Sequence, residues 1–285
     1  MDLSTDTIHE VVARALREDV GAVDLTTLAA VPAEARAEAH VVFREAGVVC
    51  GLPVARAVFA AVDPALSWKA TVGEGTRVEQ GTIVATVAGP ARGLLTGERV
   101  ALNLLQRMSG IATMAARYVE AVAGTGARIL DTRKTTPGLR ALEKYAVRTG
   151  GAVNHRYGLY DGVMLKDNHL AILAAHGLGL AEAIGRARAA VGPMVRVEVE
   201  VESVEQAAAA AAAGADMILL DNMPPAQLRA AVAAVAGRAR TEASGGITLE
   251  TIRAVAESGV DYISVGALTH SARALDIGLD IAIGV

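Results

Sequence analysis

Residues 195–222 read VRVEVEVESVEQAAAAAAAGADMILLDN, and their order of apolar and polar segments decides the fold class. The run Val195–Val199 predicts a β-strand, and Ser203–Ala213 predicts an alanine-rich helix that ends at Gly214. Met217–Leu220 is a second short apolar run and predicts a buried strand. A strand, a helix and another strand in this order indicate parallel strands covered by the helix that joins them.

The same rhythm extends along the C-terminal two thirds of the chain. The predicted strands are Ala127–Asp131, Gly162–Leu165, Val195–Val199, Met217–Leu220, Arg240–Ala243 and Tyr262–Val265, and further helices are predicted at Pro224–Ala236 and Leu249–Ser258. The last three strands recur at intervals of about 20 residues, which suits compact βα units. No Gly-x-Gly-x-x-Gly turn follows the first strand and no P-loop occurs, which argues against dinucleotide-binding and NTPase folds. We therefore expect an α/β barrel or a doubly wound sheet.

The N-terminal third has a different pattern. A helix is predicted over residues 7–19 with Asp6 as its N-cap. Short alternating runs then predict a small antiparallel sheet with one helix, formed by His40–Arg44, Ser67–Val72, Ile83–Val87 and the helical segment Pro53–Val62. A long helix should follow from about Thr96, with a break at Ser109–Gly110.

Composition limits the class of protein. The chain has 285 residues, of which 52% are hydrophobic, so it can bury a large core and can hold a barrel plus a smaller domain. The single cysteine, Cys50, excludes an internal disulfide and suits a reducing cytoplasm; we expect it to be a small buried hydrophobe. A net charge of −4 argues against general nucleic-acid binding. The start has no secretory-signal pattern, and no apolar run reaches the roughly 20 residues of a membrane helix. We expect a cytoplasmic protein that binds neither nucleic acid nor membrane.

Each predicted strand of the second region ends in polar or glycine residues. In chain order these are Arg133 and Lys134, Lys166-Asp167-Asn168, Glu198 and Glu200, Asp221-Asn222, Glu242 with Ser244-Gly245-Gly246, and Gly266 followed by His270. In a parallel barrel the carboxyl ends of the strands meet on one face, where active sites form. One such residue is easily explained as a helix cap or a turn, but six consecutive strand ends are not. The sequence predicts a ligand site on this face.

The strongest local signal is Asp-Thr-Arg-Lys-Thr-Thr-Pro-Gly at residues 131–138. Arg133 and Lys134 stand where a strand passes into a helix, whose start we place at Thr136 with Pro137 as the first helical residue. Two adjacent cations contribute nothing to a core at that junction but are well placed to bind an anion. A basic pocket in an acidic protein is typical of a site for a small anionic ligand.

Other strand ends suggest what else the site binds. Barrels commonly hold a phosphate between their last loops, and the glycines at Ser244-Gly245-Gly246 and at Gly266 let backbone N–H groups approach phosphate oxygens. Glu200 and Asp221 lie on neighbouring strands and could hold Mg²⁺ through water or accept hydrogen bonds from ribose hydroxyls. Together with the cations, these features suit a phosphorylated sugar and a second, acidic substrate.

Two other classes stay open at this point. A lysine that ends a barrel strand can be a Schiff-base nucleophile, as in an aldolase, and Lys166 has that position. Such a lysine should lie among few charges, whereas Asp167 follows it directly and basic residues surround it in the sequence. A non-catalytic phosphate-binding module is the other alternative, but it gives no reason for the pair Glu200 and Asp221.

Taken together, these motifs resemble the quinolinate phosphoribosyltransferase family over nearly the whole chain. The matching segments are Gly97–Arg99, Leu102–Leu104, Ser109–Thr113, Asp131–Gly138, Lys144–Gly151, Asn154–Arg156, Lys166–His169, Glu198–Val201, Leu219–Asn222, Ser244–Gly246 and Val265–His270. The resemblance implies an N-terminal α/β sandwich domain over residues 1–112, joined by the C-terminal segment 272–285. It also implies an incomplete, TIM-like α/β barrel over residues 113–271, and a homodimer with shared active sites; assembly beyond the dimer stays open.

The resemblance also implies an activity and roles for single residues. The activity is phosphoribosyl transfer from phosphoribosyl pyrophosphate to quinolinate with loss of CO₂, giving nicotinate mononucleotide for NAD synthesis, with Mg²⁺ and no organic cofactor. Around the two quinolinate carboxylates it implies Arg133, His155, Arg156, Lys166 and Arg99 of the partner subunit. It implies Lys134 at the pyrophosphate, Glu200 and Asp221 at the ribose hydroxyls and Mg²⁺, and further substrate contacts at Thr132, Ser244, Gly245, Gly246, Val265, Gly266, Ala267 and His270.

In this scheme the catalytic residues are Lys134, Lys166, Glu200 and Asp221. A paralogue of the same fold that acts on another acidic base, including the molybdenum-transport-associated members, remains the nearest alternative.

Overall fold

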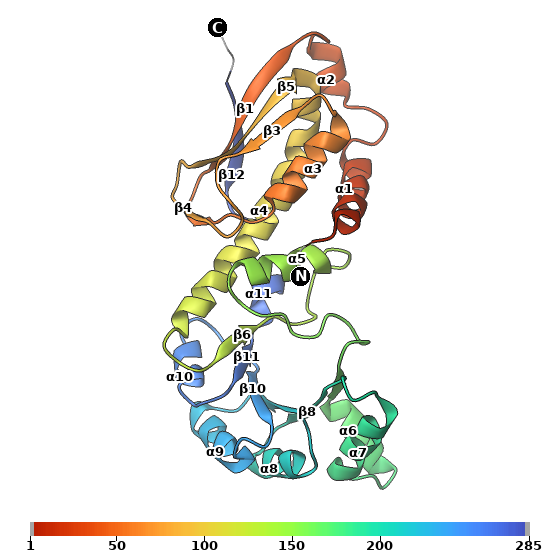
Figure 1. Ribbon diagram of the computed structural model, residues 1–285, viewed down its shortest axis with the longest axis vertical. Helices are drawn as coiled ribbons and strands as arrows, with labels where there is room; N and C mark the ends of the chain where they lie inside the picture. The colour runs from red at the N-terminus through yellow and green to blue at the C-terminus, as the bar shows by residue number, and fades with distance from the viewer. Residues whose placement is uncertain (1–2, 283–285) are drawn as a thin grey trace. The chain divides into compact units, whose positions relative to one another are not determined.

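The computed structural model describes residues 3–282, which form two compact units (Figure 1). The first unit is drawn from residues 1–116, 135–151 and 268–285, as far as they are described, and the second from residues 117–134 and 152–267. The chain therefore passes between the units four times. The mixed α/β class predicted from the sequence is confirmed.

The first unit is built on an antiparallel sheet with the strand order β12-β1-β5-β3. Its strands are β1 (Arg36–Phe43), β3 (Ser67–Ala70), β5 (Ile83–Pro90) and β12 (Ile277–Ala282), with a separate ribbon of β2 (Gly47–Val48) and β4 (Arg77–Val78). The helices of this unit are α1 (Thr5–Asp19), α2 (Leu25–Ala30), α3 (Leu52–Val62), the first part of α4 (Ala91–Ala121), α5 (Arg140–Thr149) and most of α11 (Ala267–His270). The small antiparallel sheet expected from the alternating runs is thus present, and the C-terminal strand β12 pairs with β1.

The core of this unit lies between the sheet and two of its helices. Val41 and Phe43 of β1 are two residues apart and so point to the same side of the sheet. They pack in one buried cluster with Leu52 of α3 and with Leu102 and Leu105 of α4. Full burial of a side chain of this size contributes about 1.5–3 kcal/mol. The aliphatic sequence pattern of β1 and α4 therefore positions the sheet on its helices.

Helix α4 is continuous from Ala91 to Ala121, so both the start near Thr96 and the break at Ser109–Gly110 were wrong. Glycine at 110 serves close packing instead, because a Cβ atom there would lie 1.9 Å from the carbonyl oxygen of Arg273. The hydroxyl of Ser109 donates to the carbonyl of Cys50 and accepts from its amide, both at 3.1 Å. Other segments of the chain thus approach the helix closely at Ser109 and Gly110, and the helix continues through both residues.

Two helix starts also differ from prediction. The N-cap of α1 is Ser4, whose hydroxyl accepts from the Thr7 amide, and Asp6 lies inside the first turn. Helix α5 begins at Arg140 rather than at Thr136 and Pro137. The amide of Thr136 donates to the carboxylate of Glu143, and Gly138 has a φ of +80°. Residues 132–139 therefore form an extended turn that carries Arg133 and Lys134 ahead of the helix.

The second unit is a six-stranded parallel sheet with the order β6-β11-β10-β9-β8-β7. The strands are β6 (Arg128–Leu130), β7 (Val163–Leu165), β8 (Val197–Val201), β9 (Met217–Asp221), β10 (Arg240–Ser244) and β11 (Tyr262–Ser264). The helices of this unit are α6 (Asp167–Ala175), α7 (Leu180–Ala190), α8 (Val204–Ala212), α9 (Pro225–Val235) and α10 (Ile252–Ala256). All six strands expected from the sequence are present, with ends shifted by up to two residues.

The strand order is that of a barrel with one open seam. The first strand, β6, pairs with the last, β11, which closes the ring on that side as in a barrel. On its other side β6 has only an isolated parallel bridge between Leu130 and Val153, and β7 is the far edge of the sheet. The incomplete TIM-like barrel expected from the family resemblance is confirmed.

Two expectations from composition can be compared with the structure. Cys50 is fully buried, and burial raises the pKa of its thiol, as expected for a packed cysteine. Within residues 3–282 no single helix has both the length and the apolar composition to cross a membrane. The pair α6 and α7 reaches that threshold only when its two helices, bent by 106°, are taken together.

Candidate active site

The parallel strands bring the predicted site residues to one edge of the sheet. Because all six strands run in the same direction, the residues that end or follow them share the carboxyl-terminal edge. These are Thr132, Arg133 and Lys134 after β6, Lys166 after β7, Glu200 in β8, Asp221 in β9, Ser244–Gly246 at the end of β10, and Val265–Ala267 after β11. The sequence pattern of strand ends thus corresponds to one face of the barrel.

Lys166, Glu200 and Asp221 form the charged centre of this edge. The Lys166 ammonium pairs with the Glu200 carboxylate on the neighbouring strand. Burial and, after it, the negative charge of Glu200 raise the pKa of Asp221. Two carboxylates that repel each other beside a cation are typical of a site that receives further positive charge. As hard oxygen ligands they fit Mg²⁺, since a divalent ion would relieve the repulsion that raises the pKa of Asp221.

Arg133 and Arg156 form the basic part of the site. Burial and the charge of Arg133 lower the pKa of Arg156, so the two guanidinium groups are near enough to repel each other. One Arg156 nitrogen, Nη1, donates to the carbonyl of Gly162 at 2.9 Å. An anion with two carboxylates would offset the repulsion between two such cations.

Asp131 holds the segment that carries His155 and Arg156. Its carboxylate is fully buried and accepts from the Asn154 side chain at 2.6 Å and from the His155 backbone amide at 2.8 Å. Asp131 ends the strand run that leads into Arg133. One buried carboxylate therefore holds residues 154–155 close to the segment that leads into Arg133.

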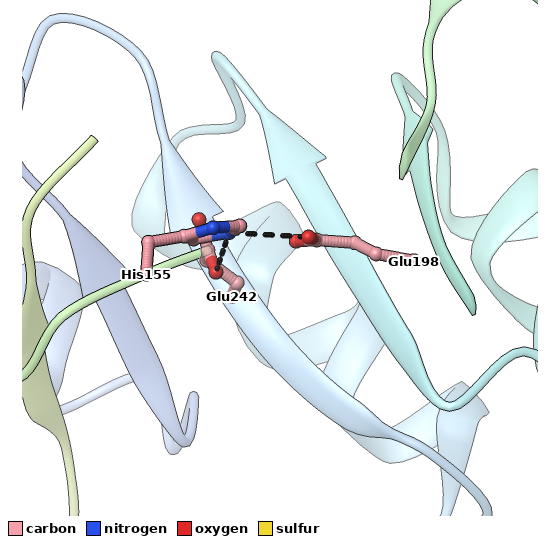
Figure 2. Close-up of side chains that lie close together, drawn as sticks. All are labelled: His155, Glu198 and Glu242. Atoms are coloured by element: carbon pink, nitrogen blue, oxygen red, sulfur yellow. Dashed lines mark ion pairs between the residues drawn. The ribbon is translucent and has the colours of Figure 1, made fainter. Parts of the chain in front are cut away.

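His155 lies against two buried carboxylates in the interior of the barrel (Figure 2). Its Nε2 is 3.1 Å from Glu198 of β8 and 3.4 Å from Glu242 of β10. The side chains of His155 and Glu242 are 11% and 1% exposed. Burial alone would lower the pKa of His155, but the hydrogen bonds and charges of Glu198 and Glu242 outweigh it and raise the pKa to about 10. Burial also raises the pKa of Glu198.

One backbone contact disfavours a positive charge on the His155 ring. The Arg156 amide donates to Nδ1 at 2.7 Å, which suits a neutral ring. The two carboxylates favour the charged ring, but a proton on Nδ1 requires the contact with the Arg156 amide to open. In either form Nε2 carries a proton that faces the carboxylates. Although His155, Glu198 and Glu242 have the side chains of a metal site, the proton on Nε2 occupies the position a metal would need.

The loop after β10 depends on glycine. Gly245 has a φ of +97° and Gly246 a φ of +60°, the left-handed region that favours glycine. A Cβ atom on Gly245 would lie 2.1 Å from Oδ1 of Asn222. Asn222 also has a positive φ, of +54°. Its backbone amide donates to the carbonyl of Ser244, and its side-chain amide donates to the carboxylate of Asp221. The glycines thus bring the β10 loop against the end of β9, beside the carboxylate of Asp221.

Not every predicted site residue lies in the barrel unit. Arg99, in α4, and His270, at the end of α11, belong to the first unit. Arg99 lines a cavity of about 370 Å³ with Asp24 and Thr96. The Nδ1 atom of His270 lies 2.7 Å from the hydroxyl of Ser271.

A cavity of about 420 Å³ lies against the parallel sheet of the second unit. Val163, Met217 and Tyr262 line it, and each stands first in its strand. His155 and Arg156 also line this cavity. Leu130, the last residue of β6, lines it as well, whereas Lys166, Glu200 and Asp221 are not part of its lining.

Sequence reasoning missed several residues that shape the site. Glu198 and Glu242 appeared as strand-end charges without a role, and Asp131 as the first residue of the motif at residues 131–138. The alternation in β8 puts Glu198 and Glu200 on the same side of the strand, which could have marked Glu198 as an interior residue. Pairing of His155 with residues about 43 and 87 positions away carries no such local signal.

Comparison with known proteins gives a consistent assignment. Residues 24–109 match the model of the quinolinate phosphoribosyl transferase N-terminal domain, and residues 111–280 match that of the C-terminal domain. The nicotinate-nucleotide pyrophosphorylase [carboxylating] of Mycobacterium leprae is 47% identical over 98% of this chain and 99% of its own length. A probable enzyme of the same name from Bacillus subtilis is 46% identical over 93% of this chain and 90% of its own length.

Solved structures agree with the sequence comparison. The crystal structure of NadC from Streptococcus pyogenes superposes with a TM-score of 0.93 at 45% identity, covering 99% of this chain and 100% of the other. The nicotinate-nucleotide pyrophosphorylase of Francisella tularensis gives a TM-score of 0.93 at 33% identity, covering 99% and 98%. With two domain models, near full-length relatives and matching folds in agreement, the chain belongs to the quinolinate phosphoribosyltransferase family.

Proposed function

We propose that the chain transfers the phosphoribosyl group of phosphoribosyl pyrophosphate to quinolinate, with decarboxylation, and yields nicotinate mononucleotide, pyrophosphate and CO₂. The observation that carries the proposal is the pair Glu200 and Asp221 beside cationic side chains at the carboxyl ends of the strands. The relatives' names support it, since they include quinolinate phosphoribosyltransferase [decarboxylating] at 41% identity over 96% of this chain.

Quinolinate would bind at the basic part of the site. Arg133, Arg156 and Lys166 supply positive charge for its two carboxylates, and arginine suits carboxylates because its N–H groups form a fork. His155 adds a charge that Glu198 and Glu242 maintain. We assign a further contact to Arg99 of the partner subunit.

The phosphoribosyl substrate would bind across the neighbouring strand ends. We assign the ribose hydroxyls to Glu200 and Asp221, and the 5′-phosphate to the glycine-rich ends of β10 and β11 with His270. Lys134 and Thr132 would meet the pyrophosphate. Mg²⁺, held by Glu200 and Asp221 through water, would supply positive charge to the pyrophosphate oxygens.

The residues then act mainly by position and charge. As the bond from ribose C1 to pyrophosphate breaks, positive charge develops on the ring, and Glu200 and Asp221 stabilise it. Lys134 and Lys166 stabilise the departing negative charge. The pyridine nitrogen bonds to C1, and the cationic ring then withdraws electrons as the C2–carboxylate bond breaks. CO₂ leaves, and the electron pair left on C2 takes up a proton. Alignment of two bound substrates contributes much of the acceleration.

The assembly and location follow the same assignment. We propose a homodimer in which each site takes Arg99 from the other subunit, and a cytoplasmic location for the chain. We also propose a sandwich domain over residues 1–112 with 272–285 and a barrel domain over 113–271, which would let each domain contribute to a shared site.

The test is a stoichiometric assay. Protein, quinolinate, phosphoribosyl pyrophosphate and Mg²⁺ are mixed, and pyrophosphate and CO₂ are followed together. We expect release in equal amounts. Release of pyrophosphate without CO₂, when another acidic base replaces quinolinate, would show that the chain is a paralogue with a different acceptor. Borohydride trapping of a carbonyl substrate on Lys166 would assign an aldolase, and no turnover by a folded dimer would reject the proposal.

A further inference from the structure

A buried ion pair outside the proposed site connects several segments of the first unit. The Nε and Nη2 atoms of Arg107, in α4, donate to Oε1 of Glu143, in α5, at 3.1 and 2.7 Å. The Glu143 side chain is 1% exposed and the Arg107 side chain 25%, so the carboxylate is the buried partner. A buried carboxylate is costly unless it is fully hydrogen-bonded, so the other contacts of this pair decide what it does.

Each remaining polar atom of the pair binds backbone rather than another side chain. Nη1 of Arg107 donates to the carbonyl of Ala272 at 2.7 Å, and Nη2 also donates to the carbonyl of Thr269. The second carboxylate oxygen of Glu143, Oε2, accepts the amide of Thr136 at 3.0 Å. One guanidinium and one carboxylate thus hold the backbone at two segments far apart in sequence.

Both segments adjoin residues to which the proposed function gives substrate contacts. Thr136 is two residues after Lys134, which we assign to the pyrophosphate. Thr269 precedes His270 in α11, a helix that starts directly after Gly266. The bond from the Thr136 amide to Glu143 holds residue 136 in the turn before α5, where the sequence suggested the first turn of that helix.

We propose that Arg107 and Glu143 are positioning residues for the phosphoribosyl substrate: their ion pair fixes the turn at Thr136 and the segment at Thr269 in the conformation that binds it. The proposal rests on the proposed function for the identity of that substrate. Neither residue is assigned a contact with substrate. Their role depends on the fork of arginine, which reaches three acceptors at once, and lysine offers no such geometry.

A purely stabilising role makes a different prediction. Well-packed apolar residues often replace a buried ion pair without loss of stability, whereas removal of one partner leaves a buried charge unpaired. In the double variant Arg107→Met/Glu143→Leu, an ion pair that only stabilises would be dispensable. A pair that orients backbone through hydrogen bonds would not, because the apolar pair has no donors for Thr269 and Ala272 and no acceptor for Thr136.

The experiment compares Arg107→Lys, the Arg107→Met/Glu143→Leu double variant and the control Arg188→Ala. Arg188 forms a separate ion pair with Asp216 and also bonds the carbonyl of Gly214, within the barrel unit. We expect the first two variants to raise KM for phosphoribosyl pyrophosphate at least tenfold, about 1.4 kcal/mol, with a smaller change in KM for quinolinate. The control should lower Tm and leave both KM values unchanged.

Amide hydrogen exchange gives a second readout that does not need turnover. We expect faster exchange at Thr136 and over residues 268–272 in Arg107→Lys, with little change in the sheet β12-β1-β5-β3. Wild-type KM in a folded Arg107→Lys protein or in a stable double variant would overturn the inference, as would unchanged exchange at Thr136. Absence of turnover in the wild-type chain would instead reject the proposed function and leave the exchange result to decide the inference.

Discussion

Arg133 and Lys134 are adjacent cations to which we assign different substrates, quinolinate and the pyrophosphate. It lies close enough to Arg156 for their charges to repel, while Lys134 is the next residue in the turn. We predict that Arg133→Ala weakens quinolinate binding by about 1.5–3 kcal/mol, since a charged hydrogen bond is lost. KM for phosphoribosyl pyrophosphate should change much less. Lys134→Ala is the matched control and should show the reverse pattern. Equal losses for both substrates in Arg133→Ala would contradict the assignment.

The pKa of His155 predicts a pH dependence of stability. Glu198 and Glu242 raise it from 6.5 to about 10, so the folded state holds a proton that the unfolded state releases first. The stabilisation is fully present below pH 6.5 and is lost as the pH rises toward 10. Each pKa unit corresponds to about 1.4 kcal/mol.

Urea unfolding between pH 6.5 and 10 measures this effect when the wild-type chain is compared with Glu242→Gln. The variant keeps the other titrating groups but lacks one of the two carboxylates. Its free energy of unfolding should fall less steeply with pH than that of the wild type. Parallel slopes would mean that His155 is neutral in the folded chain, as the Arg156 amide alone would favour.

At the scale of elements, two helical glycines differ in the space around them, so replacement by alanine should have opposite effects on stability. Gly110 in α4 faces the carbonyl of Arg273, and a Cβ atom would lie 1.9 Å from it. Gly185 in α7 has open space around it. We predict that Gly110→Ala destabilises by about 1–3 kcal/mol or more, because the close contact must open. Gly185→Ala should stabilise by about 0.5–1 kcal/mol. Thermal unfolding of the two variants checks both; a stabilising Gly110→Ala would show that the approach of Arg273 does not constrain the helix.

Elements whose signal is local were predictable from the sequence. All six parallel strands were expected from apolar runs, because strand formation here depends on burial of adjacent residues. The helix break at Ser109–Gly110 and the helix start at Pro137 were wrong for a common reason. Gly110 packs on Arg273 and Thr136 bonds to Glu143, and such tertiary contacts override local propensity.

Candidate site residues divide in a similar way. The carboxyl-end cluster of Lys166, Glu200 and Asp221 was expected, since parallel strands bring their ends together. The His155 cluster and the Arg107–Glu143 pair were not, because their partners are far apart in the sequence and meet only in the folded chain. The roles assigned to single residues stay predictions.

For the whole molecule, the proposed shared site makes a prediction about mixed dimers. At quinolinate concentrations far below the KM of either variant, Arg99→Ala and Arg133→Ala should each retain little activity alone, because every site lacks one of the two residues. In a heterodimer, one site regains both residues and the other loses both. After the subunits are unfolded and refolded together, random pairing should restore about a quarter of wild-type activity. Each variant refolded alone is the control. A mixture no more active than its components would show that Arg99 acts within its own chain.

The reaction itself is tested most directly by the fate of the two carboxylates of quinolinate. Two preparations of quinolinate, one labelled with ¹³C in the 2-carboxylate and one in the 3-carboxylate, are incubated with the chain, phosphoribosyl pyrophosphate and Mg²⁺. We predict that the 2-label leaves as CO₂ in step with pyrophosphate release, and that the 3-label stays in nicotinate mononucleotide. Retention of both labels in the nucleotide, or pyrophosphate release with no labelled product, would contradict the account.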